Sequence, residues 1–277
     1  MTVPRPSFSQ HELEQQLSDR DIRLLEDLER FRLLTTRQLQ RLHFPAAPLG
    51  PHRTASAATR GTTRVLNRLE GRGTIARLDR RIGGIKHGSA LTIWQLAAAG
   101  DRFLRTRRGE TTRRRYLEPG LTFTRHTLAV NDVAVEIIER ANAGHYELLE
   151  LEVEPDCWRS HSSATGGTLT LKPDLFLVTA DQSTETHSFV EIDLGTEHAP
   201  TVLRKCQGYH RYAASGLEQL ARGLFPAVVW IVPSVERAKL LRERIAAEPG
   251  LDPHMFWIIT PEAMTQQLAP YPAPTTT

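Results

Sequence analysis

The chain has 277 residues, of which 40% are hydrophobic and 24% are charged, and its net charge is +3. This length allows two domains with sizeable cores. The longest apolar runs, such as residues 225–232, are far shorter than the roughly 20 residues of a membrane-spanning helix, and the N-terminus has no apolar signal core, so we expect a cytoplasmic protein without membrane contact. The only cysteines, Cys157 and Cys206, form no CxxC pair, which argues against a zinc finger or a disulfide framework.

The charges divide the chain into two halves of opposite sign. Residues 1–116 hold 23 Lys and Arg against 11 Asp and Glu, whereas residues 117–277 hold 12 against 21. An Arg-rich segment suits the phosphate backbone of nucleic acid, because guanidinium groups match phosphate oxygens and binding releases condensed counterions. The first half is therefore the expected DNA contact, with double-stranded DNA as the partner.

Residues 1–19 are expected to be a flexible N-terminus, followed by three helices. Apolar residues at helical spacing predict the first helix over 21–31, with Asp21 as its N-cap. The second begins at Thr35 or Thr36 and is stopped by Pro45, and a loop over 46–58 follows. The third helix, over 61–69, directs Val65, Leu66 and Leu69 inward. Its arginines recur every four residues, which places them on one stripe, as in a recognition helix for the major groove: Arg60, Arg64, Arg68 and Arg72.

Two alternating segments, 74–78 and 91–96, predict a hairpin after the third helix. Its loop carries the basic residues Arg80, Arg81, Lys86 and His87. This order of elements resembles a winged helix-turn-helix domain over 20–106, closed by a helix over 97–105 and followed by a basic linker over 107–120. The alternative is that the arginines form only the solvated face of a small helical domain.

The second half predicts an α/β arrangement, so that the fold is α+β overall with a central mixed sheet in a domain over 121–267, before a disordered tail over 268–277. A helix over 127–141 carries Asp132 and Glu136 one turn apart. The remaining elements are predicted in the order strands 146–153, 169–179 and 187–194, helix 200–214, strand 225–232, helix 234–247 and strand 254–259.

Carboxylates gather in the middle of this second half. Asp174 lies inside one predicted strand, and alternation places Glu191 and Asp193 on the same side of the next. Carboxylates that converge in this way repel one another unless a cation such as Mg²⁺ or Mn²⁺ lies between them. Such an ion polarises a phosphodiester and lowers the pKa of an attacking water.

This pattern resembles the PD-(D/E)xK nuclease superfamily. Pro173-Asp174 matches the Pro-Asp of the second strand, and Glu191 matches the acidic residue of the third. Asp193 stands where the superfamily has lysine, and the resemblance implies that Lys205 or Gln207 on the following helix replaces it. Glu136 would match the further acidic residue of many members. The implied metal ligands are Asp174, Glu191, Asp193 and Glu136.

Over roughly residues 21–259 the chain also resembles the replication-relaxation family, whose members are associated with replication and relaxation of plasmid DNA. The resemblance rests on Thr-Thr-Arg-Gln-Leu from Thr35, His-Thr-Leu-Ala-Val-Asn-Asp-Val from His126, Lys-Pro-Asp from Lys172, and Val-Glu-Ile-Asp-Leu-Gly-Thr-Glu from Val190. It implies a setting, a DNA-binding protein of plasmid or mobile-element replication, whereas the reaction, metal-dependent cleavage or nicking of DNA, is what the nuclease resemblance implies.

Two alternatives stay open. In the first, the chain is a non-catalytic replication initiator or transcription regulator, whose acidic domain forms a homodimer or docks replication or mobilisation proteins. In the second, Tyr209 or Tyr212 is the nucleophile of a relaxase, which would need a metal-binding His cluster. The nearest histidines, His198 and His210, lack the HUH spacing.

Overall fold

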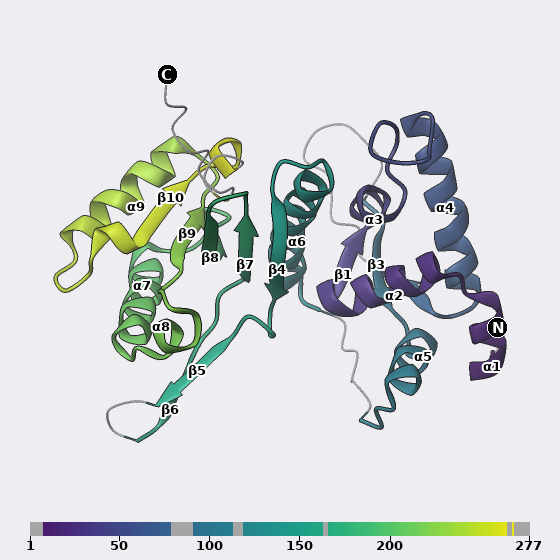
Figure 1. Ribbon diagram of the computed structural model, residues 1–277, viewed down its shortest axis with the longest axis horizontal. Helices are drawn as coiled ribbons and strands as arrows, with labels where there is room; N and C mark the ends of the chain where they lie inside the picture. Colours follow the sequence, from purple (N-terminus) through teal and green to yellow (C-terminus); the bar gives the residue numbers. More distant parts are fainter. Residues whose placement is uncertain (1–7, 79–90, 113–118, 163–165, 265–267, 269–277) are drawn as a thin grey trace. The chain divides into compact units, whose positions relative to one another are not determined.

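The computed structural model describes residues 8–78, 91–112, 119–162, 166–264 and 268 (Figure 1). The fold is mixed α/β, as expected, with a five-stranded mixed sheet and smaller antiparallel sheets. It divides into a first unit, Met1–Glu139, and a second unit, Arg140–Thr277. This division assigns most of the predicted helix over 127–141 to the first unit, whereas we expected it to begin the second domain; the domain limits themselves stay a prediction. Among the described residues, no helix is long and apolar enough to cross a membrane.

The first unit consists of helices around a small sheet. Its three strands pair antiparallel in the order β1-β3-β2, with β1 at Leu33–Thr35, β2 at Ile75–Arg77 and β3 at Ile93–Leu96. The helices are α1 (Gln10–Gln16), α2 (Asp19–Phe31), α3 (Thr36–His43), α4 (Ala55–Gly71), α5 (Ala98–Arg108) and α6 (Leu121–Asn142), the last of which extends just past the unit boundary.

Capping boxes fix where these helices begin. Helix α3 starts at the expected place, because the Thr35 side chain accepts a hydrogen bond from the Gln38 amide and Gln38 bonds back to the Thr35 amide. The expected cap of α2 was wrong by three residues: Ser18 is the N-cap, and Asp21 is the third residue of the helix, which completes the box. The same device at Ser9 begins α1, inside the segment that we expected to be flexible.

Buried polar side chains attach α6 to the rest of the first unit. The Asn131 amide donates to the carbonyl oxygens of Phe31 (3.1 Å) and Leu33 (2.6 Å), where α2 leads into β1. Gln38 donates to the Leu128 carbonyl (3.0 Å) and to the Asp132 carboxylate (2.7 Å). Two of the motifs that carry the family resemblance, in α3 and α6, therefore contact each other and hold the fold of this unit.

The second unit is built on the five-stranded sheet, in the order β10-β9-β8-β7-β4. The two pairings among β8, β9 and β10 are parallel, and those of β7 with β8 and β4 are antiparallel. A separate hairpin of β5 and β6 projects from the sheet (Figure 1). The strands are β4 (Glu147–Val153), β5 (Arg159–Ser162), β6 (Thr168–Leu171), β7 (Leu175–Ala180), β8 (Glu185–Ile192), β9 (Ala227–Ile231) and β10 (Phe256–Ile259).

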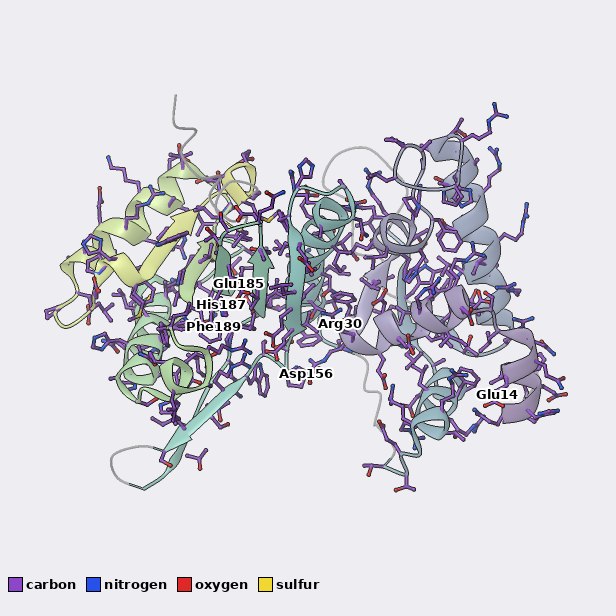
Figure 2. All side chains as sticks on the ribbon, viewed as in Figure 1. Glu14, Arg30, Asp156, Glu185, His187 and Phe189 are labelled. Carbon is purple, nitrogen blue, oxygen red and sulfur yellow. The ribbon has the colours of Figure 1, made fainter. Side chains whose placement is uncertain are left out.

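Two helices of the second unit share one face of this sheet. They are α7 (Ala199–Ala214) and α9 (Val235–Ala247), which contribute to one apolar core with Phe176, Phe189 and Trp230. A short helix α8 (Leu217–Arg222) follows α7, and 3-10 turns Pro253–Met255 and Pro261–Ala263 flank β10. Figure 2 labels Glu185, His187 and Phe189, alternate residues of β8 that mark the strand face continuing to Glu191.

Several predicted boundaries in the chain change. The expected strand over 169–179 is wrong as one element: it divides at Pro173 into β6 and β7, which belong to different sheets. Proline ends β6 because it cannot donate to a strand ladder. Helix α4 begins six residues earlier than expected, because Thr54 caps it and accepts a hydrogen bond from the Ala57 amide. Strands β1 and β5 and helix α8 were not predicted.

Candidate functional site

Asp174 and Glu191 lie at the adjoining ends of β7 and β8. The Asp174 amide donates to the Val190 carbonyl (3.1 Å), and its carboxylate accepts a hydrogen bond from the Ile192 amide (2.7 Å). Asp174 is 7% exposed and Glu191 is 1% exposed. The ladder between the two strands therefore holds two buried carboxyl groups close together, as the sequence predicted for this pair.

The Glu191 carboxyl group receives two side-chain donors from α7. Lys205 Nζ lies 3.0 Å from Oε2, and the Tyr209 hydroxyl donates to Oε1 at 2.7 Å. Burial, followed by repulsion from Asp174, raises the pKa of Glu191 to about 7, although Lys205 and Tyr209 oppose the shift. The pKa of Lys205 is also raised, because Glu191 and Asp174 outweigh the effect of burial. A buried carboxyl group that titrates near neutrality is typical of functional sites.

The other expected ligands have different partners. Asp193 forms an ion pair with Arg237 of α9 (2.6 Å) and accepts a hydrogen bond from the Gly195 amide (2.8 Å). The Asp193 amide donates to the Ile231 carbonyl (3.0 Å) and so extends the pairing of β8 with β9, and its carboxylate, like that of Glu191, is contacted from a helix of the face that α7 and α9 share. Gln207 donates to Glu248 (2.9 Å), and Glu136 pairs with Arg41 (2.6 Å) inside the first unit. Of the two proposed substitutes for the missing lysine, Lys205 contacts Glu191.

The donor set fits a divalent cation through two carboxylates. Mg²⁺ commonly takes one or two protein carboxylates and completes its shell with water and phosphate oxygens. Asp174 and Glu191 would be the two protein carboxylates. The Asp193 carboxylate is already paired with Arg237. Among the described residues, no group of three or more His, Cys, Asp and Glu side chains is placed to hold a metal ion. The four-ligand set thus stays a prediction, and within it Asp174 and Glu191 lie at the adjoining ends of neighbouring strands.

The two tyrosines considered as nucleophiles are buried. Tyr209 is fully enclosed, and Tyr212 is 4% exposed and donates to Glu218 (2.6 Å). Burial first, with the neighbouring carboxylates second, raises the pKa of both phenols. Neither hydroxyl is exposed to an incoming strand or easily deprotonated, so the geometry disfavours the tyrosine-relaxase alternative.

A pocket of about 370 Å³ opens beside Glu191 and Lys205, between the β5–β6 hairpin and α7. Its other polar lining includes His161, Lys172, Arg204 and Arg211. His161, Arg204 and Arg211 were not among the predicted site residues. The spacing of Arg204, Lys205, Gly208 and Arg211 on one side of a helix was a readable signal, but the hairpin that faces them was not predicted.

On α4, the four predicted arginines fall into two groups. Arg68 pairs with the buried Asp21 (2.5 Å), and Arg72 donates to the Gln16 carbonyl (3.1 Å). Arg60 and Arg64 are exposed and, among the described residues, have no ion pair or side-chain hydrogen bond. The stripe exists as predicted, but its C-terminal half connects α4 to α1 and α2.

A second recess of the first unit runs beside this stripe, between α3, α4 and the sheet. Its lining includes Thr36, Arg37, Thr63, Asn67 and Arg77. Arg77 donates to Asn67 (2.7 Å) and lies 4.9 Å above the Trp94 ring. The predicted wing residues Arg80, Arg81, Lys86 and His87 lie outside the described residues.

Fold and site together define a two-unit, mixed α/β protein with an exposed arginine pair on one helix and a paired-carboxyl site beside a basic pocket. The sequence model of the replication-relaxation family matches residues 25–228, most of the chain. The chain therefore belongs to the replication-relaxation family, which points to a role in replication or relaxation of plasmid or mobile-element DNA. Comparisons with curated proteins and with solved structures find no match.

Proposed function

We propose that this protein binds duplex DNA of a plasmid or mobile element through its first unit. Its second unit nicks one strand in a site formed by Asp174, Glu191 and Lys205. The observation that carries the proposal is the contact of Lys205 with Glu191, since this cation and this buried carboxyl group line one pocket and Asp174 lies next to Glu191 at the start of the neighbouring strand. Membership of the replication-relaxation family supplies the biological setting, which is replication or relaxation of plasmid or mobile-element DNA.

The first unit supports duplex binding by its element order and its charge. From α2 to β3 the elements follow one another as helix, strand, two helices and two strands, and the strands pair in the order β1-β3-β2. This is the order of a winged helix-turn-helix, in which α4 is the recognition helix. Residues 1–139 hold 24 Lys and Arg against 15 Asp and Glu. Arg60 and Arg64, exposed and without an internal partner among the described residues, are the side chains of the stripe available to phosphates or base edges.

At the cleavage site each residue has a distinct role. Asp174 is fixed by the Ile192 amide, and Glu191 is oriented by Tyr209, so both carboxyl groups are held in place before DNA arrives. Lys205 balances their charge and lies where it can approach a phosphate that develops negative charge. A divalent cation at Asp174 and Glu191 would supply Lewis-acid polarisation and an activated water.

The test is incubation of supercoiled plasmid with the full chain and Mg²⁺ or Mn²⁺. We expect conversion to the relaxed form, slowed roughly 100-fold or more by Asp174→Asn, Glu191→Gln or Lys205→Ala. Glu243→Gln is the matched control, because this carboxylate of α9 is 63% exposed and makes only a 4.0 Å ion pair with Lys239. Equal relaxation by wild type and the three site variants would reject this assignment.

One observation favours the non-catalytic alternative. Both Glu191 oxygens and both Asp193 oxygens already accept bonds from the protein, so the carboxylates are neutralised internally. In that case the second unit would serve as a dimerisation or docking platform. A wild-type chain that retards labelled duplex but leaves supercoiled plasmid intact with either metal supports this alternative over cleavage.

A further inference from the structure

The pocket beside Glu191 reverses the charge of the unit that contains it. Residues 140–277 hold 11 Lys and Arg against 17 Asp and Glu. Yet the described lining of this pocket includes Lys172, Arg204, Lys205 and Arg211, against the single carboxyl group of Glu191. A concentration of positive charge in an otherwise acidic unit attracts an anion and focuses its binding at one place.

Three of these cations lack the partners that neutralise most others in the unit. Arg159, Arg222 and Arg237 each pair with a carboxylate at 3.5 Å or less. By contrast, Arg204 donates to the Thr201 hydroxyl, Lys172 lies over the Trp158 ring, and Arg211 has no hydrogen bond or ion pair among the described residues. Their charges remain available to a ligand.

His161 adds unsatisfied hydrogen-bonding capacity at the same place. It lies on β5, its ring is 5.3 Å from that of Tyr212, and it lines the pocket. Both ring nitrogens are buried and have no hydrogen-bond partner among the described residues. Buried polar atoms without partners are unusual in folded proteins, so this ring has hydrogen-bonding capacity to offer a ligand.

The size and shape of the pocket limit what can enter. Its roughly 370 Å³ lies at the lower end of small-ligand pockets, which run from about 300 to 1,000 Å³. Gly208 keeps the α7 side open: a Cβ there would meet only Leu171 and Arg211, at 3.7 and 3.9 Å. A single nucleotide unit is of this scale, whereas duplex DNA, with a major groove about 12 Å wide, is not.

We infer that this pocket binds a phosphate of an unpaired DNA strand, held by Arg204, Arg211 and Lys172 with His161 as a further hydrogen-bonding group. The site is distinct from the duplex contact assigned to α4. It deepens the proposed function and rests on it, since a strand bound here would pass directly beside Glu191 and Lys205.

The first test measures binding of a fluorescein-labelled single strand of about ten nucleotides to the full chain, by anisotropy over a range of salt concentrations. We expect Arg204→Gln combined with Arg211→Gln to weaken binding roughly tenfold or more and to reduce the salt slope by about 1.4, or 0.7 for each lost contact. The matched control is Lys239→Gln with Arg244→Gln, which removes the same charge from exposed positions on α9.

A second variant tests the pocket without changing charge. Gly208→Leu places a side chain into the open volume and improves helix propensity by about 1 kcal/mol, so α7 is expected to remain folded. We expect loss of single-strand binding at unchanged or higher melting temperature. Duplex affinity, which depends on α4, should stay within about twofold in both pocket variants.

The outcomes separate this inference from the proposed function. Single-strand affinity lost in the Arg204/Arg211 and Gly208 variants, but retained in the α9 control, supports the site. Equal single-strand affinity in all variants overturns the site, while duplex binding through α4 still stands. If wild type binds neither single-stranded nor duplex DNA, both the site and the proposed function fail.

Discussion

Selected buried polar side chains of the two units differ in what surrounds them. In the first unit, Asn131 donates to backbone carbonyls where α2 leads into β1, and Gln38 donates to a backbone carbonyl of α6. The buried Asp21 pairs with Arg68 and accepts hydrogen bonds at the N-terminus of its own helix. In the second, Glu191 is buried beside another carboxyl group, and its pKa rises to about 7. Buried polar groups with hydrogen-bond partners stabilise a fold. A buried carboxyl group that is costly to ionise is typical of a catalytic or binding site. Asn131→Ala should therefore lower the stability, whereas Glu191→Gln should gain stability relative to wild type as the pH rises.

The largest loss of stability is expected from Asn131→Ala. The change leaves the Phe31 and Leu33 carbonyl oxygens buried without their donor and opens a cavity, so the free energy of unfolding should fall by about 3 kcal/mol. Urea denaturation of the full chain measures it. Asn142→Ala, at the exposed end of the same helix, should change it by less than about 0.5 kcal/mol. Similar losses of stability for both variants would contradict a stabilising role of the buried Asn131 hydrogen bonds.

Glu191→Gln should become more stable relative to wild type as the pH rises through neutrality. Because the folded-state pKa of Glu191 is raised from 4.5 to about 7, its contribution to stability is fully present below pH 4.5 and is lost as the pH rises through 7. Glutamine does not titrate. The stability of the variant relative to wild type should therefore improve by up to about 3 kcal/mol between pH 4.5 and 7.

Urea denaturation of both proteins across this pH range checks the prediction. A difference between variant and wild type that stays constant from pH 4.5 to 8 would show that Glu191 ionises normally in the folded protein. The contrast between the two units would then be lost.

Asp21→Asn should cost about 2 kcal/mol, less than Asn131→Ala, because Arg68 is partly exposed and can turn to solvent. The variant loses the ion pair but keeps an oxygen for the capping box with Ser18. Asp19→Asn, exposed in the same first turn, is the control and should change stability by less than about 0.5 kcal/mol. Thermal unfolding of the two variants side by side measures the difference.

Local signals made much of the first unit predictable. Thr35 with Gln38 marked the start of α3, and the apolar spacing of Val65, Leu66 and Leu69 marked the buried side of α4. The roles of the α4 arginines could not be predicted in the same way, because Asp21, the partner of Arg68, is 47 residues away in the sequence. A regular spacing places charges on a stripe but does not identify the charges that the fold itself neutralises.

In the second unit, the approach of Asp174 to Glu191 followed from their places on two neighbouring predicted strands and from the nuclease resemblance. The partner of Asp193 did not follow, since Arg237, which reaches its carboxylate, is on a helix 44 residues further along the chain. Arg204 and Arg211 were missed as pocket residues because the hairpin opposite α7 contains few apolar residues in β5, Arg-Ser-His-Ser, and gives no hydrophobic alternation.

The most direct test of the central claim is the salt dependence of duplex DNA binding by Arg60→Gln combined with Arg64→Gln. These side chains have no internal partner among the described residues, so stability should hold, while affinity falls and the salt slope decreases by about 1.8, or 0.9 for each phosphate contact. Arg23→Gln with Arg102→Gln, exposed on α2 and α5, removes equal charge and should leave slope and affinity nearly unchanged. Equal slopes and affinities for wild type and both double variants would contradict the assignment of α4 as the DNA contact.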